Sequence, residues 1–522
     1  MLTILIGRAK TGKSEQVLRR MAEAGEGGRQ ILLVPEHASH QAEVDVCRAC
    51  GDGASRHAEV LSFRRLAERV LSITGGIADV TLDNGGKLLT LQRALLETAP
   101  QLKVYRKPSR KAGFLEQMLT LFDELRCYEV TPELLWQQAQ DIGGASHDKL
   151  VDLSLLYAAY EARLCRPGLD ARDRMSKLCD HLEESGYVRG KDVFIDGFTY
   201  FNAQERRALT VFLRQARSVT VTLLGEVGSR EEIFQPSLKT MQMLERLAES
   251  ENISVKIESF TDNGTSALQH LERFFFREAA PYEGDSSAIR IREASTAYAE
   301  VEQTAADIRR LLAAGKCRCR DITVAARNMS EYMDTIETVF ERYGIPVYLS
   351  RRSDILEKPV LSLLTGVLAS ISNGFEYEDM FRWLKTGLAG LTPEECDLLE
   401  NYVLKWEIHG QMWLRDVDWT ENPDGYGAPW NDLRQQRLEQ VNGLRRRILG
   451  PLRRLTEGLK AGVTARDHAE ALYGFMEELG LEAALTERMQ RQAEAGRLQE
   501  AEETAQLWEI LCGVLDQFVE IL

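Results

Sequence analysis

The sequence predicts an α/β fold in which a domain of alternating strands and helices is interrupted by a helical insertion and then resumes. A short apolar strand, a glycine-rich loop and a helix follow one another in residues 2–24. From residue 83 to about residue 190 the chain has helical periodicity and few strand candidates. Apolar strand patterns return at 192–196 and 218–224. One interrupted domain is the simplest arrangement that accounts for this order.

The glycine-rich loop has the pattern of a phosphate-binding loop. It follows the apolar strand 2–6, fits G-x-x-x-x-G-K-[ST] and precedes a predicted helix at 15–24. Glycines allow backbone N–H groups to turn toward phosphate oxygens, and the helix N-terminus adds positive potential. Lys13 is expected to reach the β- and γ-phosphates, and the Ser14 hydroxyl to hold Mg²⁺. The predicted ATP site comprises Gly7, Arg8, Ala9, Lys10, Thr11, Gly12, Lys13 and Ser14.

Composition limits the class of protein. A chain of 522 residues is long enough for about three to four domains, and its 44% hydrophobic and 28% charged residues are typical of globular proteins. Its apolar runs fall short of the ~20 residues that span a bilayer, and the chain begins directly with a strand rather than a signal peptide. Nine scattered cysteines, an odd count, favour the reducing cytoplasm over a disulfide framework.

The net charge of −15 excludes a protein that coats nucleic acid with its whole surface, because neutralising phosphates requires Lys and Arg. Nucleic-acid contacts are therefore expected only at local basic strips. Solvated surface is the alternative interpretation of each strip. The candidate strips are Arg106, Lys107, Arg110 and Lys111; Arg351 and Arg352; and Arg445, Arg446 and Arg447.

Further elements follow in order along the chain. A second buried strand is predicted at 30–35, and a strand followed by an amphipathic helix at 60–76, which a glycine pair ends. Helical periodicity is clear at 113–126 and 150–164. A polar linker at 282–287 precedes a second strand-and-helix unit. Its predicted strands are 289–295, 321–327 and 344–349, with a helix at 299–314, and nearly all residues beyond 375 are predicted helical.

Asp196 is the expected partner of the phosphate loop. It ends the apolar strand 192–196, where a carboxylate would enter the Mg²⁺ coordination sphere. The next residue is Gly197, in place of the Glu that activates water in a motor, so hydrolysis is expected to be slow even with ATP bound. The alternative is that Asp196 is only a turn residue at the end of the strand.

Two cysteine pairs have the residue type of metal ligands. Cys47 and Cys50 form a single C-x-x-C, and Cys317 and Cys319 are separated by one residue. Neither pair has a second pair at zinc-like spacing, so a metal site at these cysteines is not predicted.

The chain also resembles a known family, the B subunit of the bacterial AddAB-type ATP-dependent helicase/deoxyribonuclease. The segments ENYVLKW and LKTGL are more specific to this family than the phosphate loop is. The resemblance is collinear over the whole chain and is carried by residues 6–14, 31–43, 60–76, 193–205, 322–332, 343–352, 381–388, 397–413, 468–482 and 515–522.

This resemblance implies a superfamily 1 helicase-like α/β fold with two RecA-like P-loop domains, each carrying a large helical insertion. The first RecA-like domain is expected at 1–104 and 191–284, interrupted by a helical insertion at 105–190. The second domain, incomplete, is expected at 285–380, and its truncated insertion at 381–522. The chain is therefore expected to be an N-terminal fragment of a longer protein.

The resemblance further implies a cytoplasmic, ATP- and Mg²⁺-binding component of a heterodimeric helicase–exonuclease that processes double-strand breaks for recombinational repair. The A subunit drives unwinding, and the B subunit, with a degenerate motor, scans single-stranded DNA for the Chi signal. Partners would be the A subunit and single- and double-stranded DNA, with no membrane. In the family, the nuclease and a 4Fe-4S cluster lie in a C-terminal domain whose ligands these residues do not include.

Residues that read Chi in the family correspond here to His37, Ser39, Phe63, Arg65 and Glu68. Phe63 is expected to stack on a base and Arg65 to pair with a base or a phosphate. Glu68 replaces a usual aromatic residue. Two other functional classes remain open from the sequence: an autonomous P-loop DNA-dependent ATPase or translocase, and a non-hydrolysing scaffold.

Overall fold

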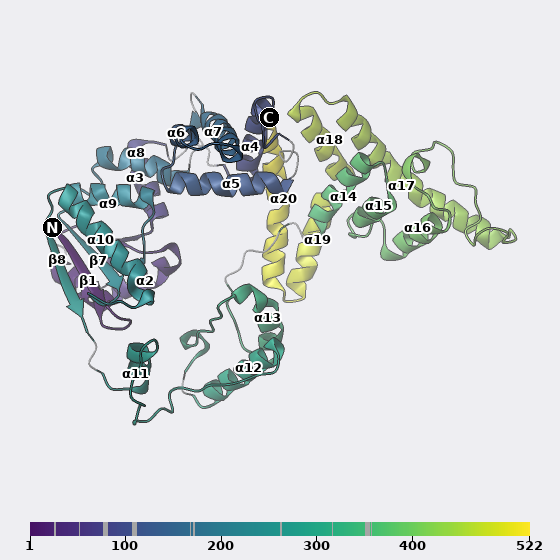
Figure 1. Ribbon diagram of the computed structural model, residues 1–522. Helices are drawn as coiled ribbons and strands as arrows, with labels where there is room; N and C mark the ends of the chain where they lie inside the picture. The colour runs from purple at the N-terminus through teal and green to yellow at the C-terminus, as the bar shows by residue number, and fades with distance from the viewer. Residues whose placement is uncertain are drawn as a thin grey trace.

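The protein combines a sheet domain with an arc of helices (Figure 1). The computed structural model describes residues 1–25, 28–51, 53–76, 82–106, 112–166, 169–170, 173–261, 264–315, 317–349, 355 and 358–522. The N-terminus lies in the sheet domain at one end of the arc, and helices rich in Leu, Glu and Arg form the other end. Within the described residues, no helix is both long and apolar enough to cross a membrane.

The sheet contains six parallel strands in the order β3-β2-β6-β7-β1-β8. Strand β1 pairs with β7 on one side and with β8 on the other, so that Leu2 faces Val219 and Val255. The α/β fold predicted from the sequence is confirmed. The strands are β1 (Leu2–Gly7), β2 (Gln30–Leu33), β3 (Ala58–Leu61), β6 (Asp192–Ile195), β7 (Ser218–Leu224) and β8 (Val255–Phe260).

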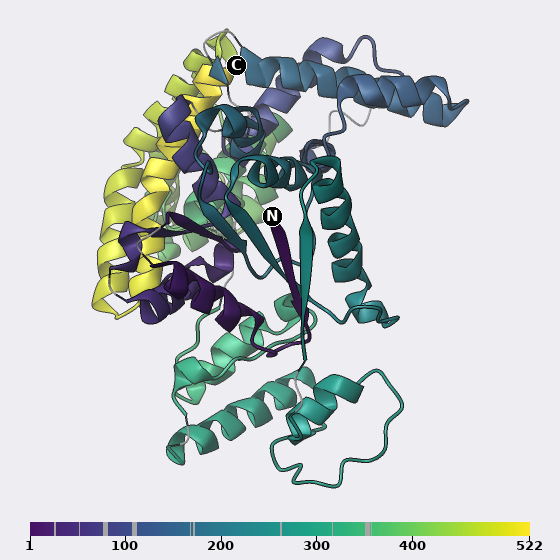
Figure 2. The same ribbon diagram turned by 90° about the vertical axis from the view of Figure 1, so that its left-hand side faces the viewer.

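Alternating residues of the strands bury opposite faces of the sheet, as the two-residue period of a strand requires. One face, which includes Leu2, Ile4 and Ile6, packs on α3 (Phe63–Thr74), α8 (Arg174–Ser185), α9 (Ala203–Gln215) and α10 (Gln235–Ser250). The opposite face, which includes Leu5 and Leu32, packs on α1 (Lys13–Ala24) and α2 (Ser39–Cys50). Figure 2 shows helices on either side of the strands.

The strands on both sides of the helical insertion belong to this one sheet. Between β3 and β6 the chain forms α3 and then a separate helical core that contains Leu91, Phe122 and Tyr160. After α3, this stretch of chain forms α4 (Asn84–Thr98), α5 (Ala112–Cys127), α6 (Pro132–Gln140), α7 (Ala145–Leu164), β4 (Cys165–Arg166) and β5 (Leu169–Asp170). It then continues into α8, which packs on the sheet.

The second predicted strand-and-helix unit lacks its strands. Its helices are α12 (Ala297–Ala313) and α13 (Met333–Arg342). In the described residues 289–315 and 317–349 no strand is present, so the predictions of strands at 289–295, 321–327 and 344–349 are wrong for this structure. Ile322 and Val324 pack on α12 and α13, but a strand also requires a neighbouring backbone with which to form a ladder.

The remaining helices form the largest apolar core, which contains Trp383, Trp413 and Tyr402. The last helix, α20 (Leu498–Ile521), lies against α4 of the separate helical core that contains Phe122. There the Arg93 guanidinium donates to the carbonyls of Ile521 and Leu522 at 2.7 Å. The helices are α14 (Pro359–Asn373), α15 (Tyr377–Leu384), α16 (Pro393–Lys405), α17 (Asp432–Ala461), α18 (Ala465–Glu478), α19 (Leu481–Glu494) and α20 (Leu498–Ile521).

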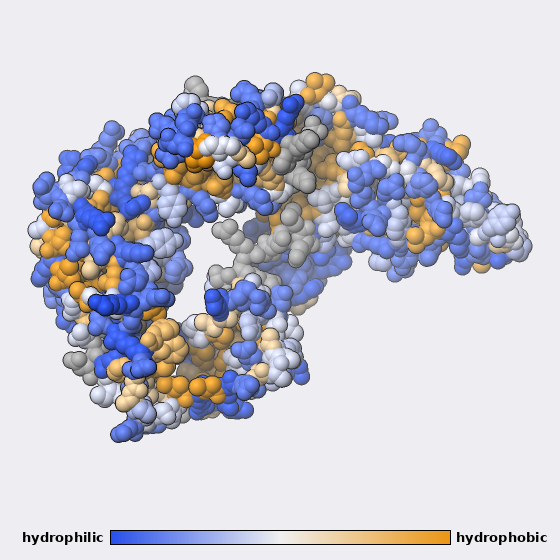
Figure 3. All heavy atoms as spheres, viewed as in Figure 1, coloured by the Kyte–Doolittle hydropathy of each residue, from blue (hydrophilic) through white to orange (hydrophobic). Residues whose placement is uncertain are grey.

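The space-filling view shows an opening in the molecule between the sheet domain and the α12–α13 unit (Figure 3). Most of the visible surface is hydrophilic, with scattered apolar patches. The carboxyl ends of the strands, where β1 leads into α1, form the edge of the sheet at which the predicted site lies.

Candidate nucleotide site at the carboxyl edge of the sheet

The loop between β1 and α1 requires glycine at both ends. A Cβ on Gly7 would lie 2.5 Å from Thr11 Oγ1 and 2.7 Å from the Phe260 carbonyl oxygen, so no side chain fits there. Gly12 has φ +89°, in the left-handed region that favours glycine, and it is the N-terminal cap of α1. This loop therefore has the strand–loop–helix placement that phosphate-binding loops use.

Lys13 is folded back onto its own loop. Its Nζ donates hydrogen bonds to the carbonyl oxygens of Gly7 at 2.7 Å and Arg8 at 2.6 Å. Burial lowers the pKa of the Lys13 ammonium, while the negative charges of Asp196 and Glu272 act in the opposite direction. The cationic group thus lies within the loop, where it would meet a phosphate.

Asp196 lies close enough to the loop for its charge to act on Lys13. Strand β7 separates β6 from β1, and Thr222 of β7 donates its hydroxyl hydrogen bond to the Asp196 carboxylate. This contact holds one carboxylate oxygen in place. The Asp196 carboxylate and the Ser14 hydroxyl are both oxygen ligands of the kind that Mg²⁺ prefers.

The described residues contain no cluster of three or more His, Cys, Asp or Glu side chains suited to a metal ion. A site with one carboxylate and one hydroxyl still fits Mg²⁺, which usually keeps several waters and binds substrate phosphates alongside one or two carboxylates. Asp196 and Ser14 would hold the ion there.

Gly197 has a backbone reason for being glycine. Its φ is +84°, and a Cβ at this position would lie 3.3 Å from Pro35 Cδ. A glutamate at 197 would therefore be strained as well as new to the site.

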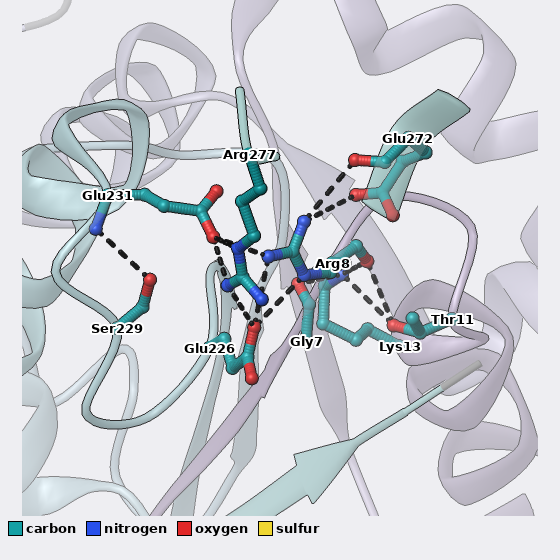
Figure 4. Close-up of polar contacts among 9 residues, drawn as sticks. All are labelled: Gly7, Arg8, Thr11, Lys13, Glu226, Ser229, Glu231, Glu272 and Arg277. Carbon is teal, nitrogen blue, oxygen red and sulfur yellow. Dashed lines mark hydrogen bonds and ion pairs between the residues drawn. The ribbon is translucent and has the colours of Figure 1, made fainter. Parts of the chain in front are cut away.

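Arg8 occupies a network of charges that the sequence pattern does not indicate. Its guanidinium donates to the carboxylates of Glu226 at 3.0 Å and Glu231 at 2.8 Å and lies 4.8 Å from the Phe234 ring centroid. Arg277 pairs with the same two carboxylates (Figure 4). Burial lowers the pKa of Arg8, but the hydrogen bond to Glu226 and the charge of Glu231 raise it overall.

The residues expected to contact DNA are not all exposed. His37 is exposed on the short helix after β2, whereas Ser39 is 7% exposed and its hydroxyl has no hydrogen-bond partner among the described residues. Phe63 is 9% exposed and packs edge-on against Phe198, with ring centroids 5.7 Å apart. The Phe63 ring therefore has no free face for a base in this structure.

Arg65 and Glu68 lie together beside the edge strand β3. Both line a groove of about 720 Å³ between α2 and α3. Arg65 forms an ion pair with Glu43, and Glu68 forms one with Arg174. Neither charge is therefore free of a protein partner.

Tyr200 is an aromatic residue at the carboxyl edge that no sequence motif singles out. It is 68% exposed, while its neighbours Phe198 and Phe201 stack on each other at 5.3 Å. The Thr199 carbonyl accepts a hydrogen bond from Thr240, and Asn202 caps α9. The loop is thus anchored on both sides of one outward-facing ring, next to the strand that carries Asp196.

The basic strip at Arg445–Arg447 is not a set of free phosphate contacts. Arg445 is 2% exposed, and its guanidinium donates to the backbone carbonyls of Trp413 and Val417 at 3.0 Å and 2.9 Å. Arg446 pairs with Asp418, and Arg447 pairs with a glutamate of α16. Lys107, Arg110, Lys111, Arg351 and Arg352 lie outside the described residues, and Arg106 is exposed.

The fold and this loop define the class: an α/β protein with a parallel sheet and a G-x-x-x-x-G-K-S loop at its carboxyl edge. The family model described as "ADDB, N-terminal" matches residues 4–272, just over half of the chain. The chain belongs to this AddB family.

Curated relatives align with the whole chain. Proteins named as the B subunit of an ATP-dependent helicase/deoxyribonuclease are 34% identical in Desulforudis audaxviator, 33% in Geobacillus thermodenitrificans and 31% in Clostridium kluyveri. Each alignment covers 100% of this chain and 47–48% of the relative. The chain thus spans about half the length of these relatives.

Proposed function

We propose that this chain is the ATP-binding, helicase-like part of a heterodimeric DNA helicase–exonuclease. The observation that carries the proposal is the G-x-x-x-x-G-K-S loop, in which Lys13 Nζ donates to the Gly7 carbonyl and the charge of Asp196 acts on the same ammonium. The relatives' names supply the activity and imply a second subunit. Recombinational repair of double-strand breaks, single-stranded DNA scanning for Chi, and the iron–sulfur cluster and nuclease of a further domain belong to the same proposal.

The strand order supports a RecA-like assignment of the sheet domain. In the order β6-β7-β1, one strand separates the carboxylate strand from the loop strand, so Asp196 and the loop follow strands two positions apart at the same edge of the sheet. The sequence places this domain at 1–104 and 191–284, an incomplete second domain at 285–380, and their helical insertions at 105–190 and 381–522. Because α4 packs in the helical core that contains Phe122, α8 packs on the sheet and α14 packs with the last helices, we propose shifted boundaries. These are 1–76 and 174–284 for the first domain, 82–173 for its insertion, 285–349 for the second domain and 358–522 for the second insertion.

The motor is proposed to be degenerate, so the 522-residue chain should hydrolyse ATP slowly whether or not single-stranded DNA is present. Gly197 stands where a motor carries the Glu that activates the attacking water, so the loop lacks that base next to Asp196. We therefore expect turnover well below about 1 s⁻¹. Gly197→Glu should not rescue it, because the new side chain would also strain the backbone at φ +84°.

Steady-state phosphate release, with and without oligo(dT), measures this expectation in the wild type and in Gly197→Glu. Turnover of about 1 s⁻¹ or more in either protein would contradict this account of the motor, and in the wild type it would identify an autonomous ATPase or translocase. Failure of the wild type to bind ATP–Mg²⁺ would leave the non-hydrolysing scaffold as the better assignment.

Single-stranded DNA is proposed to cross the carboxyl edge of the sheet near His37, Ser39 and Arg65, with Tyr200 as the stacking residue. Tyr200→Ala should weaken oligo(dT) binding by about 1–3 kcal/mol, the range for loss of one base–aromatic stack. Tyr200→Phe should retain affinity because the ring remains.

Tyr128→Ala is the matched control for this experiment, since Tyr128 is 60% exposed but lies in the helical insertion. Fluorescence anisotropy of labelled oligo(dT) reports all four affinities. Equal affinities for Tyr200→Ala and Tyr128→Ala would move the DNA path away from this loop.

A further inference from the structure

Helix α11 (Ala267–Phe274) is attached to the sheet domain by charges rather than by an apolar face. Of its eight described residues Ala267 is buried, whereas Leu268 and Leu271 are 57% and 38% exposed. Glu272 of α11 and Arg277 just beyond it both join the network around Arg8. Ion pairs between partly exposed side chains are weak and are screened by salt, so this attachment is easily displaced.

Glu272 reaches the phosphate loop from the side opposite Glu226 and Glu231 (Figure 4). Arg8 Nη1 donates to the Glu272 backbone carbonyl at 3.3 Å and lies 3.6 Å from its carboxylate. The carboxylate also lies within electrostatic reach of Lys13. One acidic side chain therefore acts on two cations of the loop, Arg8 by contact and Lys13 through its charge.

A nucleotide would bring several negative charges to the same place. Its phosphates would approach Lys13 and the loop N–H groups, and they would repel the Glu272 carboxylate, because like charges a few ångströms apart destabilise each other. The phosphates would also compete with Glu272 for Arg8 and Lys13. Nucleotide in the loop and Glu272 on Arg8 are thus mutually unfavourable.

We propose that Glu272 is an affinity-determining residue of the nucleotide site. Its contact attaches α11 to the loop, and nucleotide binding weakens this attachment. This inference rests on the nucleotide binding proposed above. Because coupling between two sites is reciprocal, Glu272 lowers the affinity for ATP by the same factor by which ATP weakens the hold of α11 on the loop. Nucleotide binding in the loop would thereby loosen the attachment of the segment that connects α11 to α12.

The test compares the affinity for a fluorescent ATP analogue with Mg²⁺ in the wild type, Glu272→Gln and Glu278→Gln. Glu278 is the matched control, an exposed carboxylate six residues further along the same segment. We expect Glu272→Gln to bind about fivefold or more tightly, the lower end of the range for coupled sites. The gain should shrink as salt is raised, while Glu278→Gln stays near the wild type.

A second readout follows α11 itself. Trypsin cleavage after Arg277, quantified by mass spectrometry, should be faster with ATP–Mg²⁺ in the wild type and independent of nucleotide in Glu272→Gln. If nucleotide does not accelerate this cleavage in the wild type, the proposed coupling between nucleotide binding and the attachment of α11 is wrong.

The outcomes separate this inference from the proposed function. Binding to the wild type with equal affinity in Glu272→Gln and Glu278→Gln, or weaker binding in Glu272→Gln, would overturn the role of Glu272 and leave nucleotide binding standing. No binding to any of the three folded proteins would overturn both.

Discussion

Replacing Lys13 by alanine is expected to weaken ATP–Mg²⁺ binding by on the order of 1.5–3 kcal/mol, the contribution of a hydrogen bond to a charged group. The Lys13 ammonium donates to the carbonyls of Gly7 and Arg8, so it lies within the loop proposed to bind the phosphates. Nucleotide binding would exchange these two carbonyls for phosphate oxygens, which form stronger charge-assisted bonds.

Lys239→Ala is the control, since Lys239 is an exposed cation on α10 of the same domain and lies outside the loop. Titration with a fluorescent ATP analogue should separate the two variants by about tenfold or more in dissociation constant. Equal affinity of Lys13→Ala and the wild type, with both shown to be folded, would rule out this role of Lys13.

Arg445→Ala is expected to destabilise the apolar core that contains Trp413 by on the order of 3–5 kcal/mol, because three buried carbonyls would lose their donor. The guanidinium donates to the carbonyls of Trp413, Arg415 and Val417 and lies 4.8 Å from the ring centroid of Trp419. Its removal would leave buried acceptors without donors, at about 1–3 kcal/mol each, and would open a cavity in α17. Burial also lowers the pKa of Arg445, whose guanidinium donates to backbone carbonyl groups.

Arg446→Ala is the matched control for stability. Arg446 is the next residue of the same helix, and its ion pair with Asp418 is exposed, so its loss should change the free energy of unfolding by less than about 1 kcal/mol. Urea unfolding followed by circular dichroism compares the two variants. The structural role of Arg445 would be contradicted if both were equally stable.

The parts of the site that local sequence can predict are those set by short-range patterns. The strand, loop and helix around Gly7–Ser14 follow one another within 24 residues, and their periodicity and glycines are visible in the chain. Strands β6 and β7 are predictable in the same way, because both are short apolar runs bounded by polar residues.

The parts that local sequence cannot predict depend on residues far apart in the chain. Arg8 and its partner Glu226 are separated by 218 residues, and Arg8 and Glu272 by 264. Edge strand β8 gives no clear signal because its side chains are largely exposed, so it lacks the apolar run of a buried strand. The reverse error occurs at 321–327, where an apolar run finds no strand partner among the described residues.

The burial of individual side chains is the second property of the site that local sequence does not predict. The sequence presents Phe63 and Tyr200 as aromatic residues near strand ends, and only the packing distinguishes the 9% exposed ring from the 68% exposed one. Arg445 lies in a run of three arginines that is typical of surface, yet its helical position turns it toward the carbonyls of residues 413–417. Such assignments require the fold.

Hydrogen exchange of the backbone amides of residues 7–14, with and without ATP–Mg²⁺, tests the nucleotide site most directly. If the N–H groups of this loop hold the phosphates, nucleotide should slow exchange in the peptides that cover it, in the wild type but not in Lys13→Ala at the same concentration. Unchanged exchange at 7–14 under saturating nucleotide, or protection confined to another part of the chain, would contradict the assignment.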